Sequence, residues 1–459
     1  MKKRHLSIFI LLIFSLLCVL GFRYTKQRNS FDISETIDNI EYLSSEKLGG
    51  RLAGTLGNTE ASVFVRDWFK KNGIEPLTKD YMESFEVLAP KKLNGSAYLK
   101  IVNSSGAAVH QFKYGTDFKE DMLNFQSNSI NFNKKDQIHQ DKGFITVAQN
   151  NKIYLFYCPE DNNLSFRSSF FSDSNISLCV LLNKNAFDSM KNYIAKGYNV
   201  QCFLPYETEK VKINNVLGIV KGKRSNLPPI VISAHFDHLG NDLSGNTYFG
   251  ALDNASGTAF MMELAKLVKS IGQPERDIIF AAFNAEEFGC LGSKYFVQDY
   301  KGRLSGSQVF NFDMIGSDQN VPISIIGGSK DNANSPLVKD TAKICSDKNI
   351  SFKYSFEDCS DHEFFRKNNI DAVTLCDNDI SKIHTPSDKS EYISESSIHR
   401  SYILSSKLII KYAYSDYVYY IYNNTIFFIF IVLVITIFTI VMVHNKIKEA
   451  RKSNSTKIR

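Results

Sequence analysis

Residues 230–238 read Ile-Val-Ile-Ser-Ala-His-Phe-Asp-His, an apolar run that ends abruptly in polar side chains. Continuous apolar stretches rich in β-branched residues are typical of strands that helices cover on both faces. In such sheets ligands bind at the carboxyl ends of the strands, which is where His235 and Asp237 fall. An imidazole is a good zinc ligand, and an acid two residues away can hold its other nitrogen. A single His-x-Asp also fits a solvated loop, so this motif needs support from the rest of the chain.

From Asn215 onward, short apolar runs alternate with segments of helical periodicity. This alternation predicts an α/β fold in which a mixed, mostly parallel sheet lies between helices. The strand-like runs are Ile230–Ser233, Asp277–Phe283, Val309–Phe312 and Ala372–Leu375. The helical segments are Ser256–Ser270, Gly292–Gln298, Leu337–Lys348 and Glu391–Tyr412.

Two motifs after these runs carry carboxylates. In the first, GALDNASG (residues 250–257), Asp253 lies just before a predicted helix, where an Asp commonly acts as an N-cap. The same carboxylate is also suited to bridge two metal ions. In the second, NAEEFG (284–289), Glu286 and Glu287 are adjacent at the end of a strand. Neighbouring carboxylates repel each other unless a cation or a proton separates them, so a site for two metals explains the pair.

Two later motifs supply another acid and another imidazole. NFDMIG (311–316) places Asp313 in an otherwise apolar segment, where an unpaired buried carboxylate would be costly. IHTPSD (383–388) places His384 in a loop that contains a proline. Each motif alone has an ordinary structural explanation. Together they bring two imidazoles and three carboxylates to strand ends or loops, besides a further Glu and Asp, which favours a metal centre.

The ordered set HFD, GALDNASG, NAEEFG, NFDMIG and HTPSD resembles a known family. These are the co-catalytic di-zinc metallopeptidases typified by secreted bacterial leucine aminopeptidases, whose relatives include glutamate carboxypeptidases and glutaminyl cyclases. The resemblance covers roughly residues 215–412. Gly49–Gly54 (GGRLAG) also resembles the amino-terminal part of such enzymes, and Ser360-Asp361-His362 resembles their substrate-side loop.

The resemblance implies two zinc ions per chain and a ligand set for each. His235 and Asp313 would hold one zinc ion, Glu287 and His384 would hold the other, and Asp253 would bridge them. All five positions agree with the family's pattern. Two cations about 3.5–4 Å apart lower the pKa of a water molecule and polarise the scissile carbonyl, which is chemistry suited to peptide hydrolysis.

The resemblance also implies two catalytic residues that do not bind metal. Glu286 would be the general base that takes a proton from water and passes it to the leaving amine. Asp237 would orient the site from behind His235.

The chain divides into three parts between its ends. Residues 24–80 show helical periodicity and form the amino-terminal part of the catalytic domain. Residues 81–205 read as an inserted β-rich module, which resembles a protease-associated domain, and residues 206–416 form the zinc peptidase domain. The module's strand-like pieces are Ala97–Val102, Gly143–Val147, Ile153–Tyr157 and Leu178–Leu182.

Both ends of the chain carry apolar runs next to basic residues. Residues 1–23, with the run Leu6–Phe22, predict a signal anchor or a signal peptide. Residues 417–445, with the charge-free run Ile426–Val443, predict a transmembrane helix, and 446–459 form a basic tail. An aromatic belt precedes the second run at Tyr417, Tyr419, Tyr420 and Tyr422. Basic ends favour the cytoplasm, so the catalytic domain is expected outside the cell, with both termini inside if the anchor is uncleaved.

The net charge of +6 does not indicate a nucleic-acid partner, because basic residues concentrate at the two ends. The eight cysteines contain no Cys-x-x-Cys pair, so they do not predict a thiolate metal site.

The expected function is that of a membrane-anchored, extracytoplasmic exopeptidase that acts on peptides, foremost an aminopeptidase. A carboxypeptidase or another amidohydrolase of the family is the alternative. Glutaminyl cyclisation is disfavoured, because the family's cyclases use one zinc ion and lack the counterpart of His235. A non-catalytic receptor ectodomain is a more remote alternative, since such relatives have lost the ligand residues that this chain keeps.

Overall fold

The first helices among the described residues flank the Gly-Gly-Arg segment. The structure is a computed structural model that describes residues 31–415, 418 and 424–456. It begins with α2 (Ile33–Leu43) and α3 (Leu56–Lys71), joined by a 3-10 helix over Glu46–Arg51. Side chains cap both α-helices: Asp32 accepts from the Glu35 N–H, and Thr55 accepts from the Asn58 N–H. Two helices thus flank the Gly-Gly-Arg segment, in agreement with the helical periodicity of this part of the sequence.

A nine-stranded mixed sheet lies at the centre of the described residues. Its order is β1-β12-β14-β13-β15-β18-β16-β17, with β2 also paired to β12. The strands are β1 (Glu75–Pro76), β2 (Met82–Lys92), β12 (Tyr206–Val220), β13 (Ile230–His235), β14 (Ile278–Phe283), β15 (Gln308–Phe312), β16 (Ile323–Gly327), β17 (Phe352–Phe356) and β18 (Asp371–Asp377).

Parallel pairing is confined to part of this sheet. The central strands β14, β13, β15 and β18 run parallel to one another, as do β16 and β17. The contacts of β12 with β1, β2 and β14 are antiparallel, as is that of β16 with β18. The expected mixed sheet is confirmed, but it is not mostly parallel, because four of its strand pairs are parallel and four are antiparallel.

Helices cover both faces of the sheet. On β13, Ile230 and Ile232 face a core built with α2, α3, α5 (Gly257–Ile271), α7 (Pro336–Asp347) and α9 (Glu395–Ala413). Val231 faces the opposite core, built with α6 (Leu291–Leu304) and α8 (His362–Lys367). This alternation with burial on both sides is why the strand reads as continuously apolar.

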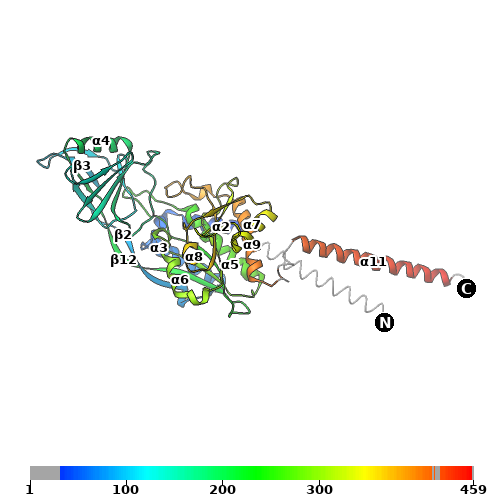
Figure 1. Cartoon of the computed structure of the whole chain (residues 1–459). Coiled ribbons are helices and arrows are strands. Elements are labelled where there is room, and N and C mark those ends of the chain that lie inside the picture. Colours follow the sequence, from blue (N-terminus) through cyan, green and yellow to red (C-terminus); the bar gives the residue numbers. More distant parts are fainter. Residues whose placement is uncertain (1–30, 416–417, 419–423, 457–459) are drawn as a thin grey trace.

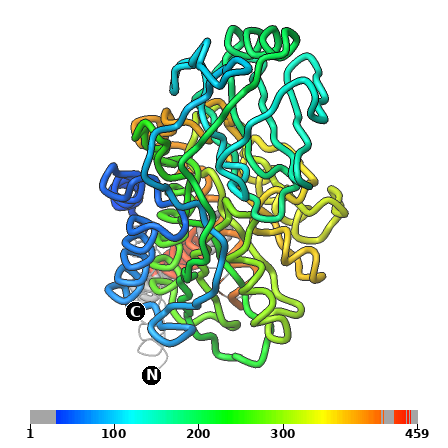
Figure 2. Tube along the Cα trace, turned by 90° about the vertical axis from the view of Figure 1, so that its left-hand side faces the viewer, coloured from blue at the N-terminus to red at the C-terminus, as the bar shows by residue number. Residues whose placement is uncertain are grey.

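The β-rich module is joined to the main body by a two-stranded ribbon (Figures 1 and 2). The ribbon consists of β2 and residues 206–215 of β12, and the rest of β12 pairs with β14 in the main sheet. The module holds a five-stranded sheet, a four-stranded sheet and α4 (Lys184–Ala195). The first sheet is β5 (Phe118–Glu120), β10 (Ile176–Leu182), β9 (Lys152–Tyr157), β8 (Phe144–Gln149) and β7 (Gln137–Gln140), and the second is β4 (Ala108–Phe112), β3 (Tyr98–Val102), β11 (Asn199–Phe203) and β6 (Ser129–Phe132).

The module also packs against the main body away from the ribbon. Its apolar core continues into Leu239, Tyr248 and Phe288 of the catalytic part. The exact domain boundaries, and the kinship with protease-associated domains, stay predictions.

One described helix is long and apolar enough to cross a membrane. It is α11 (Asn424–Thr456), in which the window Ile431–Lys448 has no buried residues (Figure 1). This observation concerns length and composition alone. The predicted amino-terminal anchor in residues 1–23 and the tyrosines of the predicted aromatic belt lie outside the described residues.

Candidate metal centre

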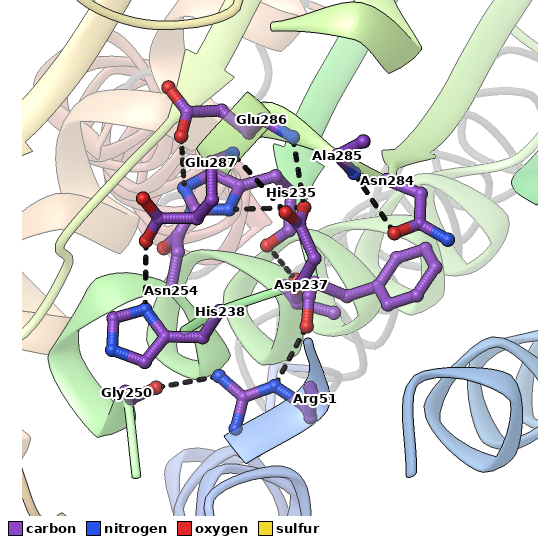
Figure 3. A network of polar contacts seen from close by, with 12 residues as sticks. Arg51, His235, Asp237, His238, Gly250, Asn254, Asn284, Ala285, Glu286 and Glu287 are labelled. Atoms are coloured by element: carbon purple, nitrogen blue, oxygen red, sulfur yellow. Dashed lines mark hydrogen bonds and ion pairs between the residues drawn. The ribbon is translucent and has the colours of Figure 1, made fainter. Parts of the chain in front are cut away.

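The ends of neighbouring strands bring the predicted site residues to one place (Figure 3). β13 ends at His235, β15 ends directly before Asp313, and the loop after β14 carries Glu286 and Glu287. The structure gathers all seven predicted residues there, namely His235, Asp237, Asp253, Glu286, Glu287, Asp313 and His384.

The first group of donor atoms is His235, Asp253 and Asp313. His235 Nε2 lies 3.5 Å from Asp253 Oδ1 and 3.4 Å from Asp313 Oδ1. His235 is 1% exposed and Asp253 is 5% exposed, so these two donors are shielded from bulk water, while Asp313 is partly exposed. The three ligand atoms lie within 4.8 Å of one another, which is close enough to share one cation.

The second group is built on the other oxygen of the same Asp253. His384 Nε2 lies 3.2 Å from Asp253 Oδ2 and 3.4 Å from Glu287 Oε2. Since Oδ1 of Asp253 faces the first group and Oδ2 faces the second, this carboxylate lies between two potential cation positions. That is the arrangement expected of a bridging ligand.

His238 joins the second group, although no role was expected for it from the sequence. Its Nδ1 lies 2.9 Å from Glu287 Oε1 and 4.0 Å from Asp253 Oδ2. The short contact to Glu287 does not have hydrogen-bond geometry, so both atoms lack a hydrogen-bond partner. The signal was present in the sequence, because His238 closes the His-Phe-Asp-His motif.

Asp237 supports the loop that carries Glu286 and Glu287. Its Oδ1 accepts from the Glu286 N–H at 3.1 Å and its Oδ2 accepts from the Glu287 N–H at 3.2 Å. Its Oδ1 also lies 3.7 Å from His235 Nδ1, on the side of the imidazole away from the donor group. One buried carboxylate therefore fixes the loop of the two glutamates by hydrogen bonds and lies beside the imidazole of His235 without bonding it.

Arg51 supports the loops beneath the centre. The guanidinium is fully buried and donates to the Phe236 carbonyl at 2.7 Å, the Phe249 carbonyl at 2.8 Å and the Gly250 carbonyl at 2.9 Å (Figure 3). Burial lowers its pKa to about 10, against the opposing effect of nearby carboxylates led by Asp388. This explains why the Gly-Gly-Arg segment accompanies the metal motifs.

Unsatisfied buried acceptors indicate that the residues fit a pair of cations. Asp313 Oδ1 and Glu287 Oε1 are buried and have no hydrogen-bond partner. A buried carboxylate oxygen without a partner costs free energy, and a cation removes that cost. Nitrogen and carboxylate donors without thiolates are the set that zinc uses in catalytic sites.

Charge coupling shifts the pKa values of the imidazoles upward. Burial alone would lower the pKa of His384, but Glu287 and Asp253 raise it to about 9. In the same way Glu286 and Asp313 outweigh burial and raise the pKa of His235 well above its usual range. Positive charge is therefore strongly favoured at both places.

The pKa values of the adjacent glutamates are pushed apart. Burial raises the pKa of Glu286 well above its usual range, helped by Glu287 and Asp313 and opposed by His235. For Glu287, burial is outweighed by His384 and His238, so its pKa is lowered. A carboxylate that accepts a proton readily therefore stands beside one that stays ionised, as a base beside a ligand requires.

The three residues of the predicted substrate-side loop differ in their roles. Ser360 Oγ donates to Asp313 Oδ2 at 2.8 Å, and Asp361 is fully buried with both carboxylate oxygens lacking partners. Burial raises the pKa of Asp361 to about 7. His362 instead bonds Thr374 and the Glu357 carbonyl, away from the donor groups.

Comparison with known proteins agrees with this centre. Residues 215–409 match the model of Peptidase family M28. Aminopeptidase YwaD of Bacillus subtilis is 32% identical over 199 residues, which cover 41% of this chain and 42% of that protein. Probable glutamate carboxypeptidase LAMP1 of Arabidopsis thaliana is 36% identical over 107 residues, or 22% of this chain and 14% of that protein. The aligned part is thus less than half the length of these relatives.

Solved structures share the fold over a longer stretch. The aminopeptidase from Aneurinibacillus sp. strain AM-1 aligns with a TM-score of 0.60 at 18% identity, covering 85% of this chain and 96% of that one. BSAP, a zinc aminopeptidase from Bacillus subtilis, aligns with a TM-score of 0.60 at 18% identity, covering 84% and 96%. At this identity the likeness concerns the fold, and it extends beyond the M28 segment.

Proposed function

We propose that this chain is a zinc-dependent metallopeptidase that removes amino-terminal residues from peptides. The observation that carries the proposal is the placement of Asp253 between two donor groups, with one carboxylate oxygen toward each. The similarity to aminopeptidase YwaD supports the same reaction.

The donor groups divide the expected ligands between two zinc ions. His235 and Asp313 would hold one, Glu287 and His384 would hold the other, and Asp253 would contribute to both. When bound, zinc supplies Lewis acidity, which lowers the pKa of a water molecule and polarises a peptide carbonyl.

Glu286 is suited to move the proton in this reaction. Its side chain is 14% exposed, and its Oε2 lies 3.9 Å from His235 Nε2, at the rim of the first donor group. The carboxylate takes a proton from the attacking water and gives it to the leaving amine, because its raised pKa favours accepting it. Asp237 keeps the backbone of Glu286 in place meanwhile.

The charge around the donors favours a free amino terminus over a free carboxylate. Besides the ligands, the carboxyl groups of Glu286 and Asp361 lie close enough to the site to interact with its charges, and a nearby ammonium group favours their ionised form. Two buried arginines lie beside the site, but Arg51 and Arg167 both donate to main-chain carbonyls and do not face it. This favours an aminopeptidase over the carboxypeptidase suggested by the second relative.

A small apolar cluster beside the ligands supports a preference for apolar side chains. Leu252, Met314 and Ile383 are the chain neighbours of Asp253, Asp313 and His384. They pack into one cluster that is separate from the large cores, completed by Ile326 and Cys376. A substrate side chain next to the metals would meet Leu252 and Ile383, which are the partly exposed members of this cluster.

We further propose that the catalytic domain lies outside the cell and that α11 anchors it in the membrane. The apolar window in α11 and the basic residues after it support this arrangement.

The test is to measure zinc content and the end of the peptide that is trimmed. Purified protein is expected to hold about two zinc ions and to cleave leucyl chromogenic amides but not their N-acetylated forms. Trimming from the carboxyl end would establish the carboxypeptidase alternative. A single tightly bound zinc ion would favour the cyclase-like alternative, and two zinc ions without hydrolysis would contradict the enzymatic function.

A further inference from the structure

A loop of the inserted module contacts the metal centre directly. Between β9 and β10, residues 165–170, here called the strap, run without regular secondary structure. Within the strap, the Arg167 N–H donates to the His384 carbonyl at 3.1 Å and the Phe170 N–H donates to the Glu287 carbonyl at 2.8 Å. The strap therefore contacts the two residues that are proposed to hold the same zinc ion.

Ser169 also binds the carboxylate of one of these residues. Its Oγ donates to Glu287 Oε2 at 2.6 Å. The first donor group has the same feature, because Ser360 Oγ donates to Asp313 Oδ2 at 2.8 Å. In each case the other oxygen, Glu287 Oε1 or Asp313 Oδ1, has no hydrogen-bond partner. A serine thus fixes one oxygen of each terminal carboxylate, although the two serines come from different parts of the chain.

Phe166 fixes the imidazole of the same group. Its ring stacks on the His384 ring, with centroids 5.6 Å apart and planes at 25°. This ring contact and the main-chain bond from Arg167 constrain both the plane and the position of His384. His384 lies in a loop and is not part of a strand, so the sheet does not hold it in place. The contacts with Phe166 and Arg167 restrict its movement instead.

The strap is itself firmly held on the module and on the body. Ser168 donates through its N–H and its Oγ to Asp121, both at 2.8 Å. Arg167 donates to the Leu239 carbonyl at 3.0 Å and lies 4.0 Å from Glu120, and all these groups are buried. Because the strap is held by contacts to both the module and the main body, it can fix the positions of the side chains that it contacts.

We propose that the strap completes the second zinc site, with Ser169 and Phe166 acting as positioning residues for Glu287 and His384. This rests on the proposed function, since it assigns these ligands to zinc. Groups that orient metal ligands are typically worth 10–100-fold in metal affinity. The inserted module thereby controls how tightly one of the two metals is held, while the first site depends on the catalytic part alone.

The test compares zinc affinity in matched variants of the full-length chain. Ser169→Ala is expected to release one zinc ion at a chelator concentration about 10–100-fold below that needed for the unmodified chain, and to keep the other. Ser169→Thr retains the hydroxyl and is expected to keep both. Ser174→Ala is the control, because that serine lies in the same loop and its Oγ accepts only from the Ile176 N–H.

A second pair tests the ring contact. Phe166 is 38% exposed and Phe171 is 40% exposed, but only Phe166 stacks on His384. Phe166→Ala is expected to weaken the same single zinc ion, and Phe171→Ala to leave zinc affinity unchanged.

The outcomes separate the strap from the proposed function. If the unmodified chain binds two zinc ions and Ser169→Ala and Phe166→Ala hold them as tightly as their controls, the strap has no such role while the enzyme assignment stands. If the unmodified chain binds no zinc, both ideas are overturned.

Discussion

Replacing Glu286 by Gln separates proton transfer from metal binding. The Glu286 carboxylate accepts one hydrogen bond from a neighbouring side chain, from Cys290 Sγ at 3.4 Å, and the bond to Asp237 uses the backbone N–H. An isosteric amide therefore leaves the loop and the five proposed ligands in place, but it cannot accept a proton.

The expected loss follows from that single change. General-base catalysis contributes about 10²–10⁴-fold, which corresponds to about 3–5 kcal/mol of activation free energy. Turnover of a leucyl amide should fall by that factor, while zinc content and the melting temperature should stay near those of the unmodified chain.

Glu287→Gln is the matched comparison, because it makes the same chemical change at the next residue. Glu287 is proposed as a ligand, so its loss of charge should lower zinc affinity, and excess zinc should restore part of the rate. Added zinc should not rescue Glu286→Gln. The reasoning is refuted if Glu286→Gln keeps most of its activity, or if excess zinc rescues it instead of Glu287→Gln.

Three further outcomes are expected. His235→Ala should remove one of the two zinc ions preferentially, as metal analysis of the purified protein would show, and equal loss of both would contradict the division of ligands. Burial raises the pKa of Glu83 to about 7, because the folded chain favours the protonated carboxyl group. The folded state therefore keeps its full stability below about pH 4.5 and loses part of it as the pH rises through 7 and this carboxyl group ionises. Glu83→Gln should therefore raise the free energy of unfolding by up to about 3 kcal/mol at pH 8 and change it little at pH 4.5, and a shift of equal size at both pH values would refute this cause. Protease added to intact cells should digest residues 24–424. Digestion of the termini alone would show that the chain has the opposite orientation in the membrane.

The parts of the fold that could be predicted are those where burial dictates composition. All six residues of β13 and all six of β14 are buried, so both strands stand out as apolar runs. β17 could not be recognised, because Lys353 and Tyr354 in it are exposed. The outer part of β12 carries charged residues such as Glu209 and Lys210, since it forms a ribbon instead of a buried sheet.

The site shows the same division. The proposed ligands could be found because each lies in a dense motif, at a strand end, just before a helix or, for His384, in a loop that contains a proline. Ser169 could not, since it contacts Glu287 from 118 residues away and its surroundings, Phe-Arg-Ser-Ser-Phe, carry no metal-site pattern. Such long-range positioning contacts depend on how two packed units meet, which local sequence does not encode.

The ribbon also bears on the order in which the chain folds. Lys92 pairs with Tyr206, so β2 and β12 can join only after the intervening residues have been made and their ends brought together. Closing so long a loop in an unfolded chain costs conformational entropy. If the insert has already folded, its two ends are close together and this cost is smaller. An insert that folds early would act as the turn of one very large hairpin formed by β2 and β12. The paired β12 would then be placed in register to pair with β14. Truncating it would then slow assembly of the central sheet, even though every strand of that sheet remained in the chain.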